Sequence, residues 1–216
     1  MRSPVISGRA GIFLLIVLAS TASAAISLTP TTVGRVTTSG TPSTLTTSTT
    51  SLGVGDSSND TQVFASIFNF TINASAAEIA AATQITFTIT ATSQTGTGPD
   101  VRLVAFDTDD NGIQAADASA AGQIVATYPA ATIAAGLPLS LSFDVTSMVK
   151  ADALAGNFSS YRLEAPTTVD NNDGGGDVFV FGTIGTHDAR LNIIPEPTGS
   201  ALMACALALS LARRRR

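Results

Sequence analysis

The chain has 216 residues, of which residues 25–195 hold five basic and fifteen acidic side chains, a formal charge of −10. An acidic body of this kind repels phosphate backbones, which excludes nucleic acid as a partner and makes divalent cations more natural ones. The only cysteine, Cys205, lies near the C-terminus, so residues 25–195 can form no internal disulfide; their length, about 170 residues, suits one domain with a packed core.

The first 24 residues have the three parts of a secretory signal. Arg2 and Arg9 give a positive start, residues 11–19 form an apolar run, and the small residues Ala22 and Ala24 suit a signal peptidase. We therefore expect residues 1–24 to be a signal peptide, helical in its apolar run and cleaved after Ala24. The alternative is an uncleaved membrane anchor, which the shortness of the apolar run disfavours.

Residues 25–60 form a lead-in that is crowded with Thr and Ser. Such a composition suits a flexible or glycosylated stalk, but threonine also suits the pleated surface of a sheet. We favour strands at 26–37 and 45–54, with a loose join at SGTPS (39–43).

The remainder of the body alternates apolar and polar residues with the period of two that is typical of strands. Residues 61–72 are apolar on both sides of the pleat, as in the interior of a sheet, and 73–82 suit a short helical turn. One helix is expected at 147–156, begun by Asp144 or Thr146 and ended at Gly156. Further strands are expected at 83–93, 101–106, 122–128, 137–146, 159–165, 177–184 and 189–195. The pattern predicts an all-β fold over 25–194, an antiparallel β-sandwich of jelly-roll type with one short helix.

An acidic loop at 107–117, DTDDNGIQAAD, is the candidate metal site. Asp107, Asp109 and Asn111 alternate before a glycine, as in the first half of a calcium loop, and Asp117 could close an irregular site. The residue where a calcium loop has its bidentate glutamate is Ala118, which breaks the pattern. Calcium is therefore one interpretation, and a solvated acidic loop is the other.

Other chemistry has little support in the sequence. His187 is the only histidine and its neighbour is Asp188, which would point to the opposite face of a strand, so a catalytic triad is not indicated. Zinc and most redox metals lack ligands. A pair of carboxylates meeting across a cleft, as in a glycosidase, is not excluded. Aromatic sugar platforms are few, because the body has no tryptophan and only Tyr128 and Tyr161.

The C-terminal segment 195–216 has three ordered parts. These are Pro195, Glu196 and Pro197, then the uncharged residues 198–212, then Arg213, Arg214, Arg215 and Arg216. As a helix, 198–212 would span roughly 22 Å, short of the roughly 30 Å hydrocarbon core but able to stop in a locally thinned membrane. The arginines should stay in the cytoplasm, which leaves the body outside.

This order of parts resembles the PEP-CTERM sorting signal of exported bacterial proteins. The resemblance implies that an exosortase recognises the tail and cuts near Pro195, Glu196 and Pro197, which releases the body to the cell envelope or the extracellular matrix. Bacteria with such tails commonly make exopolysaccharide. The alternative is a plain C-terminal anchor of the inner membrane that is never cut.

The middle of the chain also resembles the carbohydrate-module-like jelly rolls of exported bacterial proteins, in an ordered pattern over residues 45–193. The segments that carry it are SLGVGDSSNDTQVFASIFNFTI, TQITFTITATSQTGTGPDVRLVAFD, LSFDVTSMVKADALAGNFSSYRLE and GTHDARLNI. We expect an exported, non-enzymatic protein with a structural or adhesive role linked to exopolysaccharide. A polysaccharide-binding module that uses Tyr128, Tyr161 or loop carboxylates, and a secreted hydrolase, are the alternatives.

Overall fold

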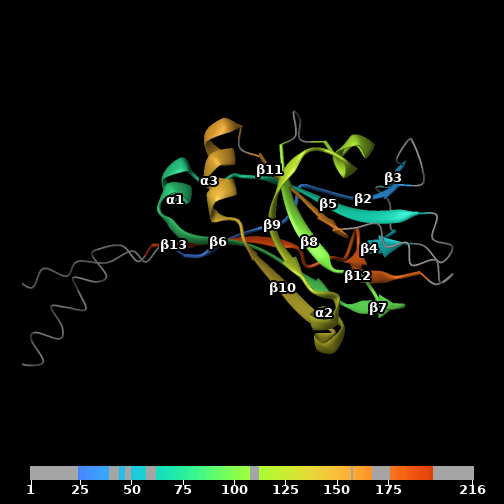
Figure 1. The fold of residues 1–216 in the computed structure, drawn as a ribbon. Helices are drawn as coiled ribbons and strands as arrows, with labels where there is room; N and C mark the ends of the chain where they lie inside the picture. The colour runs from blue at the N-terminus through green and yellow to red at the C-terminus, as the bar shows by residue number, and fades with distance from the viewer. Residues whose placement is uncertain are drawn as a thin grey trace, which may run out of the picture. The chain divides into compact units, whose positions relative to one another are not determined.

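Two antiparallel β-sheets build the body of the protein (Figure 1). The structure is a computed structural model, and it describes residues 24–38, 44–46, 50–56, 62–107, 112–156, 158–166 and 176–196. Ala24–Glu196 form one compact unit. The predicted all-β antiparallel fold is confirmed, whereas the signal helix, the transmembrane tail and the SGTPS join lie outside the described residues. Within the described ranges, every helix is too short or too polar to cross a membrane.

The smaller sheet contains the two strands at the ends of the body. Its order is β1 (Ile26–Leu28), β13 (Arg190–Pro195), β6 (Ala82–Ala91) and β10 (Leu139–Asp144). The first strand pairs with the last, with Ile26 opposite Ile193 and Leu28 opposite Leu191. The start of β1 and the end of β13 therefore lie side by side, at the same end of two neighbouring strands.

Among the described residues, the larger sheet has nine strands, arranged around β5 (Val63–Thr71). β5 pairs with β2 (Thr32–Thr38) along most of its length, with β4 (Ser51–Asp56) near its start and with β11 (Phe158–Glu164) near its end. Burial of residues 65–70 on both faces confirms the prediction of an interior strand. The other members are β3 (Thr44–Thr46), β7 (Ser93–Thr95), β8 (Val101–Phe106), β9 (Gly122–Tyr128) and β12 (Val178–Thr183).

The sequence analysis expected one helix, and that number is too small. α3 (Thr146–Ala155) is the expected helix, and α1 (Ala76–Ala80) occupies the expected helical turn. α2 (Ala130–Gly136) and the 3₁₀ turn η1 (Ala115–Ala118) were not expected. α2 is an alanine-rich run after Pro129, which ends the preceding strand, and a single buried residue, Ile133, attaches it to the core.

The start of α3 also differs in detail from the expectation. Its N-cap is Val145, which makes no side-chain cap. Asp144 instead accepts hydrogen bonds from the backbone N–H and the hydroxyl of Thr146, at 3.0 and 2.6 Å. The helix does end at Gly156, as predicted.

The core lies between the two sheets and is centred on Phe87 of β6. The ring of Phe87 is 5.4 Å from that of Phe68, 5.9 Å from that of Phe70 and 5.4 Å from that of Tyr161, all on the larger sheet. Each ring adds about 1.5–3 kcal/mol through burial and each aromatic pair about 0.5–1.5 kcal/mol. This cluster fixes the spacing of the sheets.

Neither tyrosine forms an exposed sugar platform, which corrects the residues expected for the polysaccharide-binding alternative. Tyr161 is 0% exposed, and burial raises the pKa of its phenol. The hydroxyl of Tyr128 donates to the carbonyl of Ser142 at 2.9 Å and accepts from its N–H at 3.2 Å. The Tyr128 ring packs edge-on against Phe143, so this residue joins β9 to β10.

Candidate functional site

Helix α3 borders a cleft beside the ends of β8, β9 and β11. Two adjoining pockets, of about 240 and about 350 Å³, share Phe106, Asp107 and Asp152 in their walls. Gln123 and Met148 line the first pocket, and Phe158 and Ser160 line the second. We call both pockets together the Asp107–Asp152 cleft.

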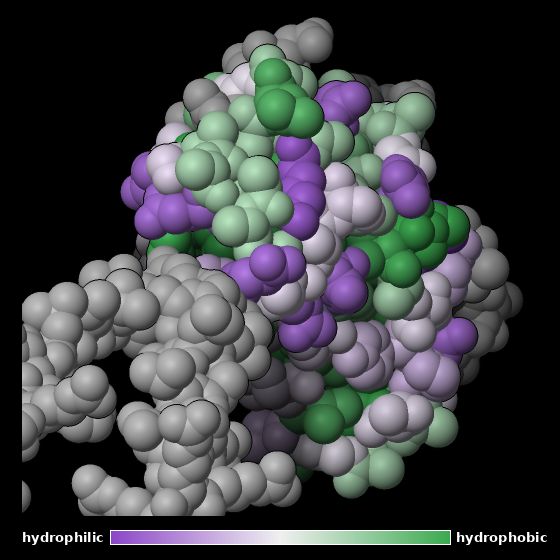
Figure 2. Space-filling view, turned by 90° about the vertical axis from the view of Figure 1, so that its left-hand side faces the viewer, coloured by the Kyte–Doolittle hydropathy of each residue, from purple (hydrophilic) through white to green (hydrophobic). Residues whose placement is uncertain are grey.

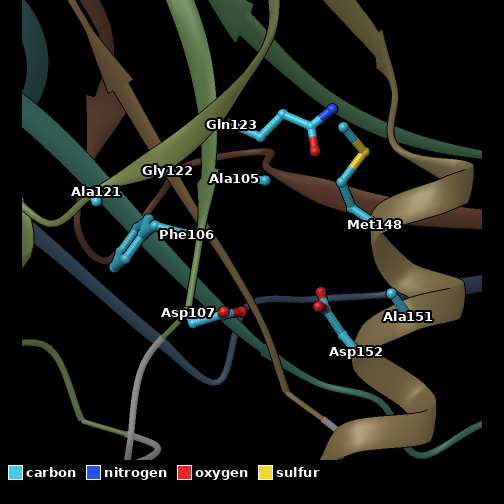
Figure 3. Close-up of a pocket in the computed structure, with 9 residues that line it drawn as sticks. All are labelled: Ala105, Phe106, Asp107, Ala121, Gly122, Gln123, Met148, Ala151 and Asp152. Carbon is cyan, nitrogen blue, oxygen red and sulfur yellow. The ribbon is translucent and has the colours of Figure 1, made fainter.

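The two carboxyl groups face each other across this cleft (Figure 3). Asp107 directly follows β8, and Asp152 projects from α3 toward it. The side chains of Gln123 and Met148 approach each other at the other end of the first pocket. The cleft therefore has an acidic middle, with apolar and amide groups on its walls.

The two carboxyl groups have different surroundings. Burial raises the pKa of Asp152, and the nearby charge of Asp107 raises it further, against a hydrogen bond from the hydroxyl of Ser159 that lowers it. Asp107 is exposed. The Asp152 carboxyl consequently takes up a proton more readily than an ordinary aspartate, and a ligand that donates hydrogen bonds or carries positive charge would relieve its repulsion by Asp107.

The cleft is held in shape by Arg162, which is 5% exposed. Its guanidinium donates to the carbonyls of Asp117 and, at 3.2 Å, of Ala120, and forms an ion pair with Glu164. It also lies over the ring of Phe106, at 5.4 Å. Arg162 thus fastens the end of the acidic loop, and the residues just after it, to β11.

The four residues of the predicted calcium loop are not seen together at one site. Asp107 lines the cleft, while Asp109 and Asn111 lie outside the described residues. The carboxylate of Asp117 accepts the backbone N–H of Gln114 at 2.8 Å and so caps η1. Within the described ranges, His, Cys, Asp and Glu side chains form no cluster of three or more that could hold a metal ion. Calcium stays a prediction.

His187 is half-buried. Its ring lies edge-on against Phe68 with 6.1 Å between centroids, and burial, followed by the charge of Arg190, lowers its pKa. Asp188 accepts the backbone N–H of Thr90 at 2.9 Å. These contacts give His187 a packing role.

The sorting-motif residues begin inside the fold. Pro195 is the last residue of β13 and pairs with Ala82, and the N–H of Glu196 donates to the carbonyl of Ala81 at 3.0 Å. Ala24 is the first described residue. Pro197, the four arginines and Ala22 lie outside the described residues.

Sequence reasoning missed Asp152, Ser159 and Arg162. Asp152 was treated as part of an ordinary helix, and only the pairing of strands brings it near Asp107. Arg162 had a local signal: it is a lone basic residue in a strand, two positions before Glu164 and therefore on the same face.

Comparison with known proteins gives no assignment, since neither a protein family nor a curated protein matches the sequence.

Proposed function

We propose that the chain is an exported bacterial β-sandwich protein of jelly-roll type with a structural or adhesive role at the cell surface or in an exopolysaccharide matrix. The signal at 1–24 exports it, the tail at 195–216 holds it transiently in the inner membrane, and an exosortase then releases the body to the envelope or the medium. It acts without catalysing a reaction.

The observation that carries this proposal is the position of the two processing points relative to the fold. The compact unit spans Ala24–Glu196, its first strand begins at Ile26 and its last strand ends at Pro195. Trimming after Ala24 and just beyond Glu196 would therefore remove none of the described strands or helices. A body of this kind can be released without unfolding.

The tail is tested by changing its charge and its motif separately. Replacement of all four arginines at 213–216 by serine removes the block to translocation and should leave the protein unprocessed and poorly retained in the membrane. A Glu196→Gln variant keeps the fold contact, which uses the backbone, but changes the motif. We expect it to accumulate in the membrane fraction. Cleavage of the tail at the unchanged rate in both variants would contradict the proposal.

A second candidate function, glycan binding, is favoured by the Asp107–Asp152 cleft. Carboxylates accept hydrogen bonds from sugar hydroxyls, and Phe106, Phe158 and Met148 supply apolar walls. The acidic middle of the cleft favours neutral or amino sugars over acidic ones. This cleft replaces the tyrosines as the surface on which glycan binding would depend.

Retention in gels that contain the producer's own exopolysaccharide tests this second function. Asp107→Asn and Asp152→Asn should each weaken retention several-fold. The matched control is Asp100→Asn, which removes the same charge and keeps the oxygen that accepts the Ala130 N–H at 2.8 Å. Equal retention of all three variants would refute glycan binding in the cleft. Release of reducing sugar that both cleft variants abolish would support the hydrolase alternative instead.

A further inference from the structure

The end of the body that carries α1 and α3 has an apolar pocket. The two helices pack together, and a pocket of about 220 Å³ is lined by Ala76, Ile79, Ala80, Lys150, Ala153 and Leu154. Leu154 is 86% exposed, more than the other large hydrophobic side chains of the described residues. Figure 2 looks onto this end and shows pale to deep green, apolar surface gathered over the helices, with purple polar side chains around it. We call this surface the α1–α3 face.

The chain leaves the body beside the α1–α3 face. The N–H of Glu196 donates to the carbonyl of Ala81, the residue that ends α1, at 3.0 Å. The ammonium group of Lys150 donates to the carbonyl of the next residue, Ala82, at 2.8 Å. Glu196 is therefore held by its backbone next to the helix that forms one wall of the pocket.

The apolar part of the tail begins only two residues later, at Thr198. Two extended residues span at most about 7 Å. The polar layer of one bilayer leaflet is about 5–8 Å thick, from the difference between the full bilayer and its hydrocarbon core. If residues 198–212 enter the membrane, Glu196 must lie within about one headgroup layer of the hydrocarbon.

The pairing of the first and last strands also favours an orientation of the precursor in which the end of the body that carries Glu196 lies toward the membrane. Because Ile26 lies opposite Ile193, the segment that follows the signal starts beside the end of the strand from which the tail leaves. Both apolar segments of the precursor can then occupy one membrane while the body is folded. Each would hold the same end of the body toward the lipid.

We infer that the α1–α3 face is a lipid-contact surface that rests on the outer leaflet of the membrane until the tail is cut. This inference rests on the anchoring step of the proposed function. Leu154 would enter the boundary between headgroups and acyl chains, and Lys150, whose ammonium group has three donors of which Ala82 takes one, would contact lipid phosphate. The strongly acidic body gives no general attraction to lipid, so the contact depends on the short tether.

The test uses the full chain in phosphatidylcholine vesicles, with Cys205→Ser to remove the natural thiol. A fluorophore is attached at Leu154→Cys or, as the matched control, at Ala135→Cys, an exposed helical position on α2, which lies away from α1 and α3 at the bottom of Figure 1. Lipids with a spin label near the headgroup should quench the probe at 154 several-fold more than the probe at 135. Equal quenching at both positions would overturn the inference.

Lengthening the tether tests the physical reason for the contact. Twenty Gly and Ser residues inserted between Pro197 and Thr198 give a mean reach of about 25 Å. Quenching at 154 should then fall toward the value at 135. Quenching that persists unchanged would refute the tether argument.

A second measurement separates failure of this inference from failure of the proposed function. In the unaltered chain, Cys205 should be protected from a water-soluble thiol reagent if the tail is inserted. Protected Cys205 with an unquenched probe at 154 would overturn the lipid contact alone. Reactive Cys205 would overturn the anchoring as well. A third outcome is a probe at 154 that is shielded from water but not quenched by lipid. If the shielding grows with protein concentration, a second copy of the chain covers this face, and the inference is overturned.

Discussion

Replacement of Arg162 by methionine tests whether this buried cation holds the acidic segment against the sheet. The variant keeps most of the side-chain volume and removes the hydrogen bonds to the carbonyls of Asp117 and Ala120, the ion pair with Glu164 and the contact with Phe106. Hydrogen bonds to charged groups contribute about 1.5–3 kcal/mol each, and a cation over a ring about 0.5–1 kcal/mol. The variant also no longer bears the cost of burying a charged group, and this offsets several kcal/mol of the loss.

We expect a net loss of about 2–3 kcal/mol, less than the usual about 3–5 kcal/mol for breaking a buried ion pair. The reason for the smaller loss is that Glu164 keeps a second partner, Arg102, at 2.6 Å. Urea unfolding followed by circular dichroism measures this loss of unfolding free energy. If the free energy falls by about 2 kcal/mol per molar urea, the unfolding midpoint should fall by about 1–1.5 M. Arg190→Met is the control and should cost well under half as much, since the guanidinium of Arg190 donates to the carbonyl of the adjacent Ala189 and so ties no distant segment to its strand.

A midpoint for Arg162→Met within about 0.3 M of the original would refute the reasoning. It would mean that the free energy gained from the contacts of this cation equals the free energy lost by removing it from water. Arg162→Lys adds a finer check, because lysine keeps the charge but not the planar fork that reaches two carbonyls. Its stability should lie between those of the original protein and Arg162→Met.

Three further predictions concern the core and the titrating groups. Phe87→Ala should lower the free energy of unfolding by about 3–5 kcal/mol in the same urea assay, because it leaves a cavity between the sheets, and a loss below 1 kcal/mol would contradict the packing. Because the pKa of Asp152 is raised in the fold, its contribution to the free energy of unfolding is present at low pH and is lost as the pH rises through that pKa. Between pH 4 and 7, Asp152→Asn should therefore lose less stability than the original protein. Because the pKa of His187 is lowered, stability should fall on acidification below about pH 6.5, and His187→Gln should flatten that fall. Identical pH profiles for the original and either variant would refute the corresponding assignment.

Most strands were predictable because their signal is local. Ile85, Phe87 and Ile89 alternate with threonines in the sequence, and all three are buried. The unexpected helix α2 escaped notice because its alanines carry no periodic pattern and only Ile133 faces the core. Short elements with one buried residue depend on the tertiary fold more than on their own sequence.

The cleft could be predicted only in part, because it depends on pairings between distant segments. Asp107 was singled out from its acidic loop, but its opposite carboxyl, Asp152, lies 45 positions away on a helix that no local motif marks. Their approach follows from the pairing of β8 with β11, together with α3, which the chain forms just before β11. A period-two pattern predicts that a strand exists and does not predict its neighbours.

The most direct test of the account is the intact mass of the protein recovered outside the producing cells, with and without the exosortase. We expect a species that begins at Ala25 and ends at Glu196 or a few residues beyond it, because Pro195 and Glu196 are held by hydrogen bonds and strand pairing within the fold. This species should be absent when the exosortase is removed. A full-length tail that stays in the membrane in both strains would contradict exosortase processing and leave a membrane-tethered surface domain.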